Sequence, residues 1–550
     1  MIKRFFLSAY LCFILCTVYC QTAIEWQGDL HYLQQTVHSK YSNLFCNISG
    51  ADWDKAVDVL HAEIPKLEKE QVLTGFVKLV ALFHIGHTQM NTFGLHLGST
   101  ALQLNRLPFQ FYSFSDGIYI LRADSKYERA VGGRVTRIGK MKIEDAMEAI
   151  RPLVSYENEQ GFISNSMFYL AIPEFLKTQG ISDNTAETAI TYLKNGKEET
   201  TIFKADRNNN VFSVTGLETP AGWVVAKKPG DLPLWQKEPS SFRYMQYLPE
   251  SKTLYVRHSV NLNDGNKTIA AFFNNMVDFI DNNDVVKLIL DVRTNGGGNN
   301  TLNKSIITGI VKSRKINQKG KFFCIIGRRT FSAAQNLVNE LEKYTEVTFV
   351  GEPTAENVNH YGEPVTEILP KSKLAVSISS LWWQDFKATD KRKATYPQLA
   401  VDMSFNDYYN NEDPVMNVIK NYDTQESIEV KLRSLVEAEK FDEAVSMANE
   451  YLKDPLHRYF KNELETKINT YGYALINQNK FNDANKVLKM NIQLFPESAN
   501  AYDSYAESFL LMGKKEDAIK YFEMAIAKDK YGVTADNSRK QIEKIKTGSN

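Results

Sequence analysis

The sequence predicts an α/β protein: a mostly parallel sheet covered by helices, with a helical and β-rich region before it and a helical repeat region after it. Over residues 285–352, apolar strand-like runs alternate with helix-like runs, which is the pattern of a parallel sheet packed against helices. From about 24 to 95, apolar residues recur at helical intervals. Residues 465–498 and 499–532 are offset by 34 residues, a period typical of helical repeats. A chain of 550 residues should accordingly hold several domains.

The first residues predict an export signal. Two early basic residues precede an apolar stretch from Phe5 to about Tyr19, after which the chain turns polar. A spanning helix needs about 20 apolar residues, so residues 1–20 fit a cleaved signal peptide better than a stable membrane span. We therefore expect a periplasmic or extracellular protein that begins at Gln21. Lipid anchoring at Cys20 is the less favoured alternative, because such signals have a small residue at the position of Tyr19.

Composition limits the possible partners and cofactors. The 65 basic and 65 acidic residues balance, so nothing in the charge indicates nucleic acid as a partner. Once the signal is removed, only Cys46 and Cys324 remain, and a disulfide framework is not expected. Cys324 lies within a strand-like run and is predicted to be a buried apolar residue. Neither zinc-ligand spacing nor a glycine-rich phosphate loop occurs, so we expect no metal and no cofactor.

The patterns divide the mature chain into five parts. A helical region covers 21–104, a small β-rich module 105–207 and a loop-rich linker 208–250. The α/β core extends over 251–420, and the helical repeats over 425–550. In the repeats, the residues at matching positions are those that pack helix on helix, so they indicate the fold and not a ligand. A docking groove for a protein partner and a purely stabilising appendage both fit.

Ser332 occupies the most informative position in the chain. It follows the apolar run KFFCIIG and begins the helix-like run AAQNLVNELEKY. A hydroxyl at a strand-to-helix turn lies among free backbone N–H groups, where the helix dipole favours a developing anion. Serine is also a preferred helix N-cap. The local sequence is therefore compatible with a nucleophile and with an ordinary cap.

A glycine triplet follows a neighbouring strand. The apolar run from Val285 to Leu290 leads through Asp291 to Gly296, Gly297 and Gly298. Glycines at the end of a buried strand let the backbone approach a ligand with its N–H groups exposed. Ligand sites in such sheets lie beyond the carboxyl ends of the strands, where Ser332 and the triplet both fall. The triplet is either part of an oxyanion hole or a plain turn.

Three segments together resemble the tail-specific, or C-terminal-processing, serine peptidases, including their tricorn-like and retinoid-binding-protein-like branches. They are LILDVRTNGGG, TFSAAQNLVNEL and FVGEPTAENVNHYGEP, in the order that this family has. The resemblance implies a crotonase-like core with Ser332 as acylating nucleophile and an oxyanion hole from N–H groups of Gly297, Gly298 and Ala333. It also implies a helical cap at the N-terminus and a degenerate PDZ-like module over 105–207. The C-terminal region resembles tetratricopeptide repeats.

The resemblance offers two ways to activate the serine. Asn357 stands where one group of the family has a lysine, which disfavours a serine–lysine pair. The segment FHIGHT resembles a family segment that ends in a DGHT-like sequence, so His87 is the candidate general base, with Ile85 where an aspartate is usual. Histidine titrates near neutrality and can take and return the proton. His84 and His360 remain competing candidates.

The resemblance also implies an acidic third member near the segment PQLAV. No glutamate occurs in QDFKATDKRKATYPQLAVDMS, and Asp390 is the nearest carboxylate there. Asp390 is therefore the candidate that orients the imidazole. The run DKRK is equally typical of a solvated charged loop.

Two functions from different classes follow from these observations. The first is an exported serine peptidase that hydrolyses peptide or protein substrates through an acyl-enzyme. The second is a catalytically inactive scaffold that keeps the fold and binds peptides or small apolar ligands, because the expected lysine, aspartate and glutamate are all missing. A thioester-handling enzyme is a third possibility for a crotonase-like core, but coenzyme A chemistry is chiefly intracellular and the export signal argues against it.

Overall fold

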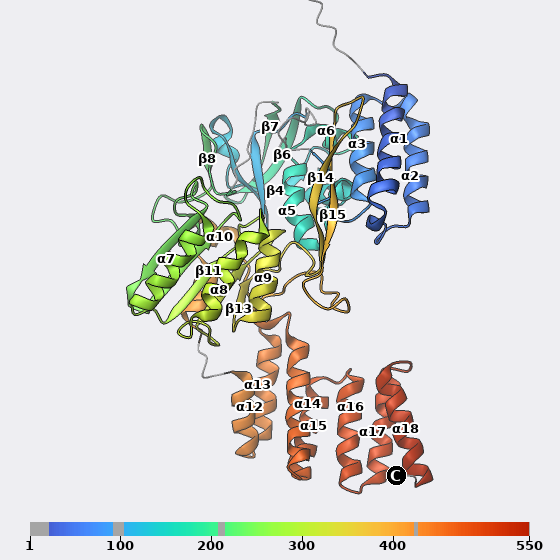
Figure 1. Ribbon diagram of the computed structural model, residues 1–550, viewed down its shortest axis with the longest axis vertical. Helices are drawn as coiled ribbons and strands as arrows, with labels where there is room; N and C mark the ends of the chain where they lie inside the picture. Colours follow the sequence, from blue (N-terminus) through green and yellow to red (C-terminus); the bar gives the residue numbers. More distant parts are fainter. Residues whose placement is uncertain (1–20, 92–103, 207–214, 423–426, 549–550) are drawn as a thin grey trace, which may run out of the picture.

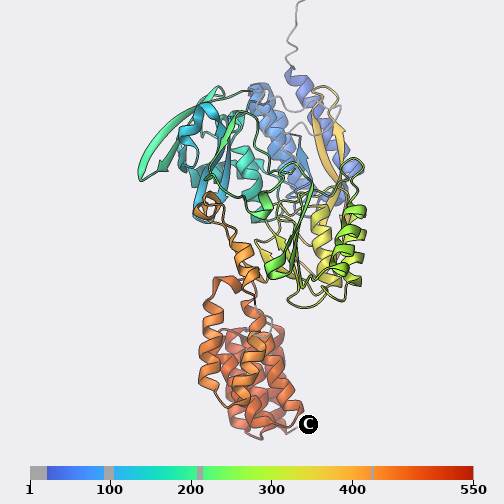
Figure 2. The ribbon, with the colours of Figure 1, turned by 90° about the vertical axis from the view of Figure 1, so that its left-hand side faces the viewer.

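The computed structural model describes residues 21–91, 104–206, 215–422 and 427–548. The predicted signal peptide and Cys20 lie outside these residues. Figure 1 shows the N-terminal helices and the sheets together in one body, with the C-terminal helices gathered below it. Figure 2 shows the same separation from the side. Among the described residues, none of the helices combines the length and the apolar character that crossing a membrane requires.

A six-stranded sheet forms the core and confirms the predicted mostly parallel arrangement. The strand order is β16-β13-β12-β11-β10-β9, and every neighbouring pair is parallel except β9 with β10. The strands are β9 (Arg243–Leu248), β10 (Thr253–His258), β11 (Lys287–Asp291), β12 (Phe322–Ile326), β13 (Thr348–Gly351) and β16 (Leu399–Ala400).

Alternating side chains of these strands enter two separate apolar clusters. One face packs against α7 (Ile269–Asn282), α8 (Lys304–Lys312) and α9 (Ala333–Tyr344), and the buried Cys324 belongs to this face. The other face packs against α11 (Pro414–Lys420). Because both faces are covered, the strands read as continuous apolar runs in the sequence.

The N-terminal helices pack beside a hairpin that comes from the core region of the sequence. These helices are α1 (Ala23–Lys40), α2 (Gly50–Glu63) and α3 (Lys69–Ala81). The hairpin strands β14 (His360–Ile368) and β15 (Ala375–Trp383) form a separate sheet, in which β15 also pairs with β1 (Gln89–Met90). The carboxylate of Asp29, on α1, accepts backbone N–H groups of Lys371 and Ser372, each at 2.7 Å. The hairpin therefore joins the N-terminal helices to the core.

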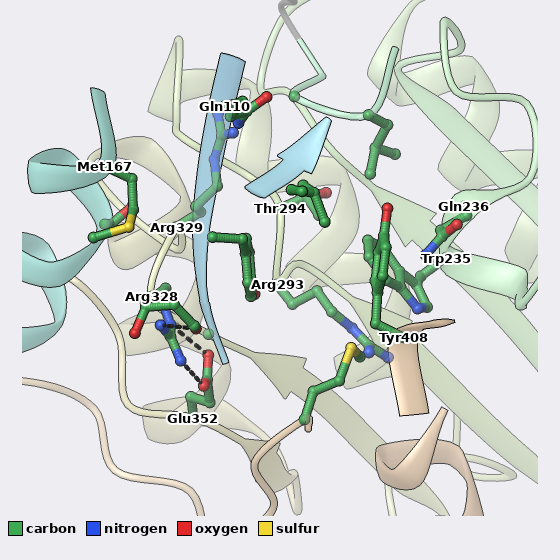
Figure 3. A pocket seen from close by; sticks show the side chains of 18 of the residues that line it. Gln110, Met167, Trp235, Gln236, Arg293, Thr294, Arg328, Arg329, Glu352 and Tyr408 are labelled. Carbon is green, nitrogen blue, oxygen red and sulfur yellow. Dashed lines mark hydrogen bonds and ion pairs between the residues drawn. The ribbon is translucent and has the colours of Figure 1, made fainter. Parts of the chain in front are cut away.

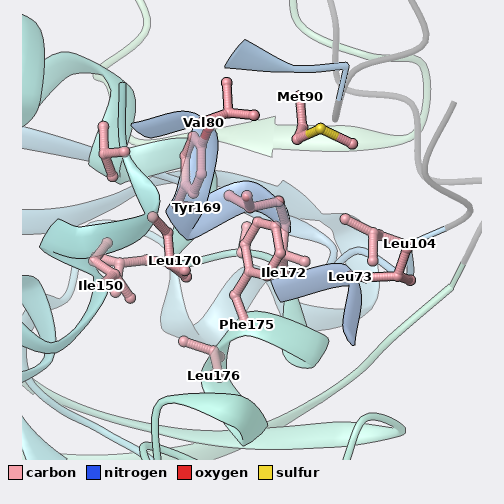
Figure 4. Close-up of a cluster of buried hydrophobic side chains, with 14 of the residues drawn as sticks. Leu73, Val80, Met90, Leu104, Ile150, Tyr169, Leu170, Ile172, Phe175 and Leu176 are labelled. Atoms are coloured by element: carbon pink, nitrogen blue, oxygen red, sulfur yellow. The ribbon is translucent and has the colours of Figure 1, made fainter. Parts of the chain in front are cut away.

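The β-rich module and the N-terminal helices share one apolar core. Figure 4 shows Leu73 and Val80 of α3 packed with Leu170, Ile172 and Phe175 of the module. The elements of the module are β2 (Phe109–Phe114), β3 (Gly117–Asp124), β4 (Arg134–Ile138), β5 (Met141–Lys142), α4 (Ile143–Ile150), α5 (Glu159–Tyr169), α6 (Pro173–Thr178), β6 (Glu187–Lys194) and β7 (Lys197–Lys204).

The stretch 208–250, expected to be a linker, contributes to two sheets where it is described. Strand β8 (Trp223–Val225) pairs with β3 in the β-rich module, and β9 forms the edge of the central sheet. Strand β8 is only three residues long and pairs with β3 alone, and β9 lies at the end of the strand order.

The C-terminal region is an all-helical array of paired helices, joined to the core through the short α10 (Phe405–Tyr409) and α11. Small residues allow the helices to approach closely: a Cβ on Gly472 would lie 2.6 Å from the Leu488 side chain. Ala484 and Ala518 are fully buried. The helices are α12 (Ile428–Glu437), α13 (Phe441–Lys453), α14 (Lys461–Asn477), α15 (Phe481–Leu494), α16 (Ala499–Leu511), α17 (Lys515–Lys528) and α18 (Val533–Thr547).

Candidate active site

Ser332 lies between β12 and α9, directly before the first helical residue. Its side chain makes no capping hydrogen bond to the helix, although serine is a preferred cap. Its φ of 58° and ψ of −128° lie outside the regions that residues with a side chain favour. Such strained backbone persists only where surrounding contacts impose it, and it clusters at functional sites. The hydroxyl is thereby directed away from the helix end.

The Ser332 hydroxyl instead contacts His87. The distance from His87 Nε2 to Ser332 Oγ is 2.9 Å, within hydrogen-bonding range. The imidazole stacks on Phe331, with ring centroids 4.4 Å apart. Gly86 leaves the space for this stacking, since a Cβ there would lie 2.9 Å from the Phe331 ring. The imidazole and the hydroxyl are thus aligned through Gly86 and Phe331, the residues that precede them in sequence.

Strand pairing brings His87 to the serine. The residues after α3 form a turn in which Thr88 N–H donates to the carbonyl of Ile85 at 3.0 Å. The next residues form β1, which pairs antiparallel with β15. Thr88 and Ser379 strengthen this pairing through contacts between their hydroxyls, and Ser379 N–H donates to Thr88 Oγ1, both at 3.1 Å. The hairpin β14–β15 therefore fixes the loop that carries His87.

Glu356 is the carboxylate beside the imidazole. Its Oε1 lies 3.0 Å from His87 Nδ1, at ion-pair distance but without the alignment of a hydrogen bond. Its Oε2 accepts the backbone N–H of Ser332 at 2.5 Å. His360 Nε2 is 3.6 Å from the same carboxylate, and the Glu356 side chain is fully buried. Glu356 therefore connects the serine backbone with two histidines.

Asp390, the predicted third member, lies elsewhere. Its carboxylate pairs with Arg392 at 2.9 Å, and Arg392 also contacts Glu342. The structure thus corrects the assignment: Glu356 stands where Asp390 was expected to act. The family resemblance points only to the stretch before PQLAV. The available signal was the second of two carboxylates in GEPTAEN, next to Asn357 and shortly after a buried strand.

The structure also places the two competing histidines and the two residues that differ from the family pattern, Ile85 and Asn357. His84 is exposed, at the turn after α3, with a φ of 49°. Ile85 is buried in the core, so no carboxylate approaches from that position. His360 is buried against Glu356 and parallel to His87, with ring centroids 6.3 Å apart. Asn357 donates its backbone N–H to Glu157 at 3.1 Å.

The glycine loop lies directly against the serine. A Cβ on Gly297 would be 2.6 Å from Ser332 Cβ and 3.1 Å from the Ala333 nitrogen, so only glycine fits there. The φ values of Gly297 and Gly298, +102° and +137°, also favour glycine.

The three residues predicted for the oxyanion hole differ in their N–H groups. That of Gly297 donates to Asn295 Oδ1 at 2.9 Å, whereas those of Gly298 and Ala333 have no acceptor within the described parts of the chain. Gly298 and Ala333 are therefore the available donors, and Gly297 serves by its lack of a side chain.

Burial sets the charges at this site. It lowers the pKa of His87, against the opposing charges of Glu157 and Glu363, so the imidazole is neutral near pH 7 and can accept a proton. Burial also raises the pKa of Glu356. The pKa of Glu157 is raised by burial and then by the charge of Glu356. The two carboxyl groups therefore titrate closer to neutrality than ordinary glutamates do.

Among the described residues, three side chains lie close enough together to hold a metal ion: His87, Glu157 and Glu356. One donor atom from each lies within 4.8 Å of the others. Two of the three, His87 and Glu356, are also the residues that contact Ser332.

Comparison with solved structures gives the fold. Mature CPAF has a TM-score of 0.52 at 12% identity, over 73% of this chain and 98% of that chain. Mature CPAF complexed with lactacystin has a TM-score of 0.51 at 11% identity, over 72% and 98%. No protein-family model and no curated protein matches the chain. At these identities the likeness shows the fold alone, which this chain shares with mature CPAF.

Proposed function

We propose that this protein is a serine-type peptidase that hydrolyses peptide bonds through an acyl-enzyme. The observation that carries the proposal is the 2.9 Å contact between His87 Nε2 and Ser332 Oγ, with Glu356 on the other imidazole nitrogen. Serine is a weak nucleophile unless a base is adjacent, and the base works best when a third group orients it. The mutual distances of Ser332, His87 and Glu356 fit these three roles.

The proposed reaction has two steps. Ser332 Oγ attacks the carbonyl carbon while His87 takes the hydroxyl proton, and Glu356 stabilises the imidazolium that forms. N–H groups of Gly298 and Ala333 bind the oxyanion. The intermediate collapses as His87 gives the proton to the leaving amine, which leaves Ser332 acylated. Water, deprotonated by His87, then hydrolyses the ester.

Reaction with a fluorophosphonate probe tests the proposal. Residues 21–550 are incubated with the probe, and the modified peptide is located by mass spectrometry. We expect modification at Ser332 in the folded protein and none after heat unfolding. A well-folded protein that is unmodified, or is modified at other serines, would contradict the peptidase and favour the inactive scaffold.

We propose export as the setting of this activity and protein docking as the role of the helical array. The signal-like residues 1–20 support the first, and the resemblance to tetratricopeptide repeats supports the second. The export is tested by mass spectrometry of the N-terminal peptide, on protein isolated from the cells that make it. Gln21 is the expected first residue, and a retained signal segment would contradict it.

The Glu356→Gln variant should react with the probe about 10²-fold more slowly, because the neutral amide stabilises the imidazolium less. A pH profile gives a second readout. Glu356 is neutral below its pKa and charged above it, and that pKa is raised. The wild-type rate should therefore keep rising with pH above the ordinary glutamate range, about pH 4.3. The Glu356→Gln variant should lose the rise in rate that follows ionisation of Glu356. It should keep only the rise at lower pH, where His87 loses its proton.

Asp390→Asn is the matched control for this carboxylate. Because Asp390 pairs with Arg392, we expect its replacement to leave both the rate and the pH profile nearly unchanged. A larger loss in Asp390→Asn than in Glu356→Gln would return the orienting role to Asp390.

A further inference from the structure

A cavity of about 420 Å³ lies beyond the carboxyl ends of the central strands. It is bounded by the ends of β11, β12 and β13 on one side and by β2, β3 and α5 of the β-rich module on the other. Figure 3 shows Met167 and Arg328 on one side of it, opposite Trp235 and Tyr408. Its size falls within the range of small-molecule sites, about 300–1,000 Å³. Apolar side chains supply much of the wall, among them Phe111, Leu121, Ile163, Met167, Trp235 and Tyr408.

Two of the arginines that line the cavity are neutralised by carboxylates. Arg293 pairs with Asp291 and Asp413, both at 2.9 Å. Arg328 pairs with Glu352, as the dashed lines in Figure 3 indicate. These two cations therefore have their charges balanced within the protein.

Three other cations in the lining have no carboxylate partner among the described residues. Arg122 is buried and donates only to neutral acceptors, Gln110 Oε1 at 2.5 Å and the carbonyl of Glu218. The guanidinium of Arg329 and the ammonium of Lys227 form neither a hydrogen bond nor an ion pair with any described residue. The cavity thus has an excess of positive charge next to an apolar wall.

The charge of Arg122 is repelled by that of Arg329, and the charge of Lys227 by that of Arg122. Burial lowers the pKa of Arg329. Burial lowers the pKa of Arg122, and so does the charge of Arg329, against the opposing charges of Tyr408 and Glu218. Burial and the charge of Arg122 lower the pKa of Lys227. Guanidinium groups nevertheless stay charged in proteins. Desolvated charges without partners are unfavourable, and an anion in the cavity would relieve the cost.

We propose that this cavity binds an apolar molecule that carries one carboxylate. Arg329 binds the carboxylate, because its planar donors match the two oxygens, with Arg122 and Lys227 adding positive charge. The apolar part lies against Trp235, Tyr408 and their neighbours. Arg329 is three residues before Ser332 on the loop after β12, so the site adjoins the proposed catalytic serine without sharing its residues. The carboxylate comes either from a free fatty acid or from the C-terminus of a polypeptide.

Binding is tested in the full mature chain with Ser332→Ala, so that the result does not depend on the proposed peptidase activity. Dodecanoate is titrated by calorimetry and compared with dodecanol, its uncharged counterpart. A short peptide ending in leucine is compared with its C-terminal amide. We expect a carboxylate probe to bind at least about tenfold more tightly than its neutral counterpart.

Adding Arg329→Met should weaken that binding about 10- to 100-fold, while Arg314→Met, at an exposed arginine of the core, should leave it unchanged. Preference for dodecanoate assigns the carboxylate to a lipid, and preference for the peptide acid to a polypeptide C-terminus.

Equal binding of acid and neutral probes, no binding of either acid, or binding that is indifferent to Arg329→Met would overturn the proposal. Thermal unfolding shows whether Arg329→Met remains folded. If it does not, Lys227→Met replaces it, and a weakening of several fold is expected, because that side chain has no partner to lose in the described structure. A failure here leaves fluorophosphonate labelling of the wild type unaffected, so the two proposals fail separately.

Discussion

Replacing His87 by alanine is expected to slow the reaction of Ser332 with a fluorophosphonate by about 10³–10⁴-fold. The imidazole is the group within hydrogen-bonding distance of the hydroxyl, at 2.9 Å, and burial lowers its pKa so that it is neutral near pH 7. Without it, the hydroxyl keeps its proton during attack. The measurement is the second-order rate constant of labelling at pH 7.5, with Ser332→Ala as the zero reference.

His84→Ala is the matched control for this variant. His84 is three residues earlier in the chain but exposed on the turn, so its loss should leave the rate nearly unchanged. If His84→Ala and His87→Ala slow labelling equally, the assignment of the base is wrong. His360→Asn should have an intermediate effect, because His360 contacts Glu356 and not the serine.

Gly297→Ala is expected to produce the other large loss, about 10²–10³-fold in labelling rate. This is the size associated with one lost oxyanion donor, because a shift of the loop would displace the N–H group of the neighbouring Gly298. The new Cβ would lie 2.6 Å from Ser332 Cβ and 2.9 Å from the carbonyl oxygen of Phe331. The Phe331 oxygen belongs to the backbone and cannot rotate away, so the glycine loop or the serine must move. The φ of +102° adds strain for any residue with a side chain, about 1–3 kcal/mol.

Gly296→Ala is the matched control for the glycine loop. A Cβ at Gly296 would meet nothing within 4 Å, so this variant should retain most of the labelling rate and its thermal stability. We expect Gly297→Ala to lose far more of its rate than its unfolding temperature explains. A Gly297→Ala protein that reacts at the wild-type rate would show that the loop does not shape the serine site.

Much of the fold could be predicted because its signals are local. The alternating strand and helix runs over 285–352 indicate the parallel sheet, since strands buried on both faces must be apolar throughout. The hairpin β14–β15 could not be predicted in this way. The hairpin follows core strands in sequence, but its strand β15 pairs with β1, some 290 residues earlier. Periodicity indicates that a strand forms and not which strand it pairs with.

The candidate site likewise combines features that the sequence predicts with contacts that only folding produces. The sequence by itself determined that Ser332 begins a helix after a buried strand and that a glycine loop follows the neighbouring strand, because both are patterns of adjacent residues. Only the tertiary structure decided that the Ser332 side chain contacts His87 instead of capping its helix. It also decided that Glu356, not Asp390, faces the imidazole. Two carboxylates look alike in sequence, and their roles differ because folding buries one between two histidines and leaves the other with an arginine.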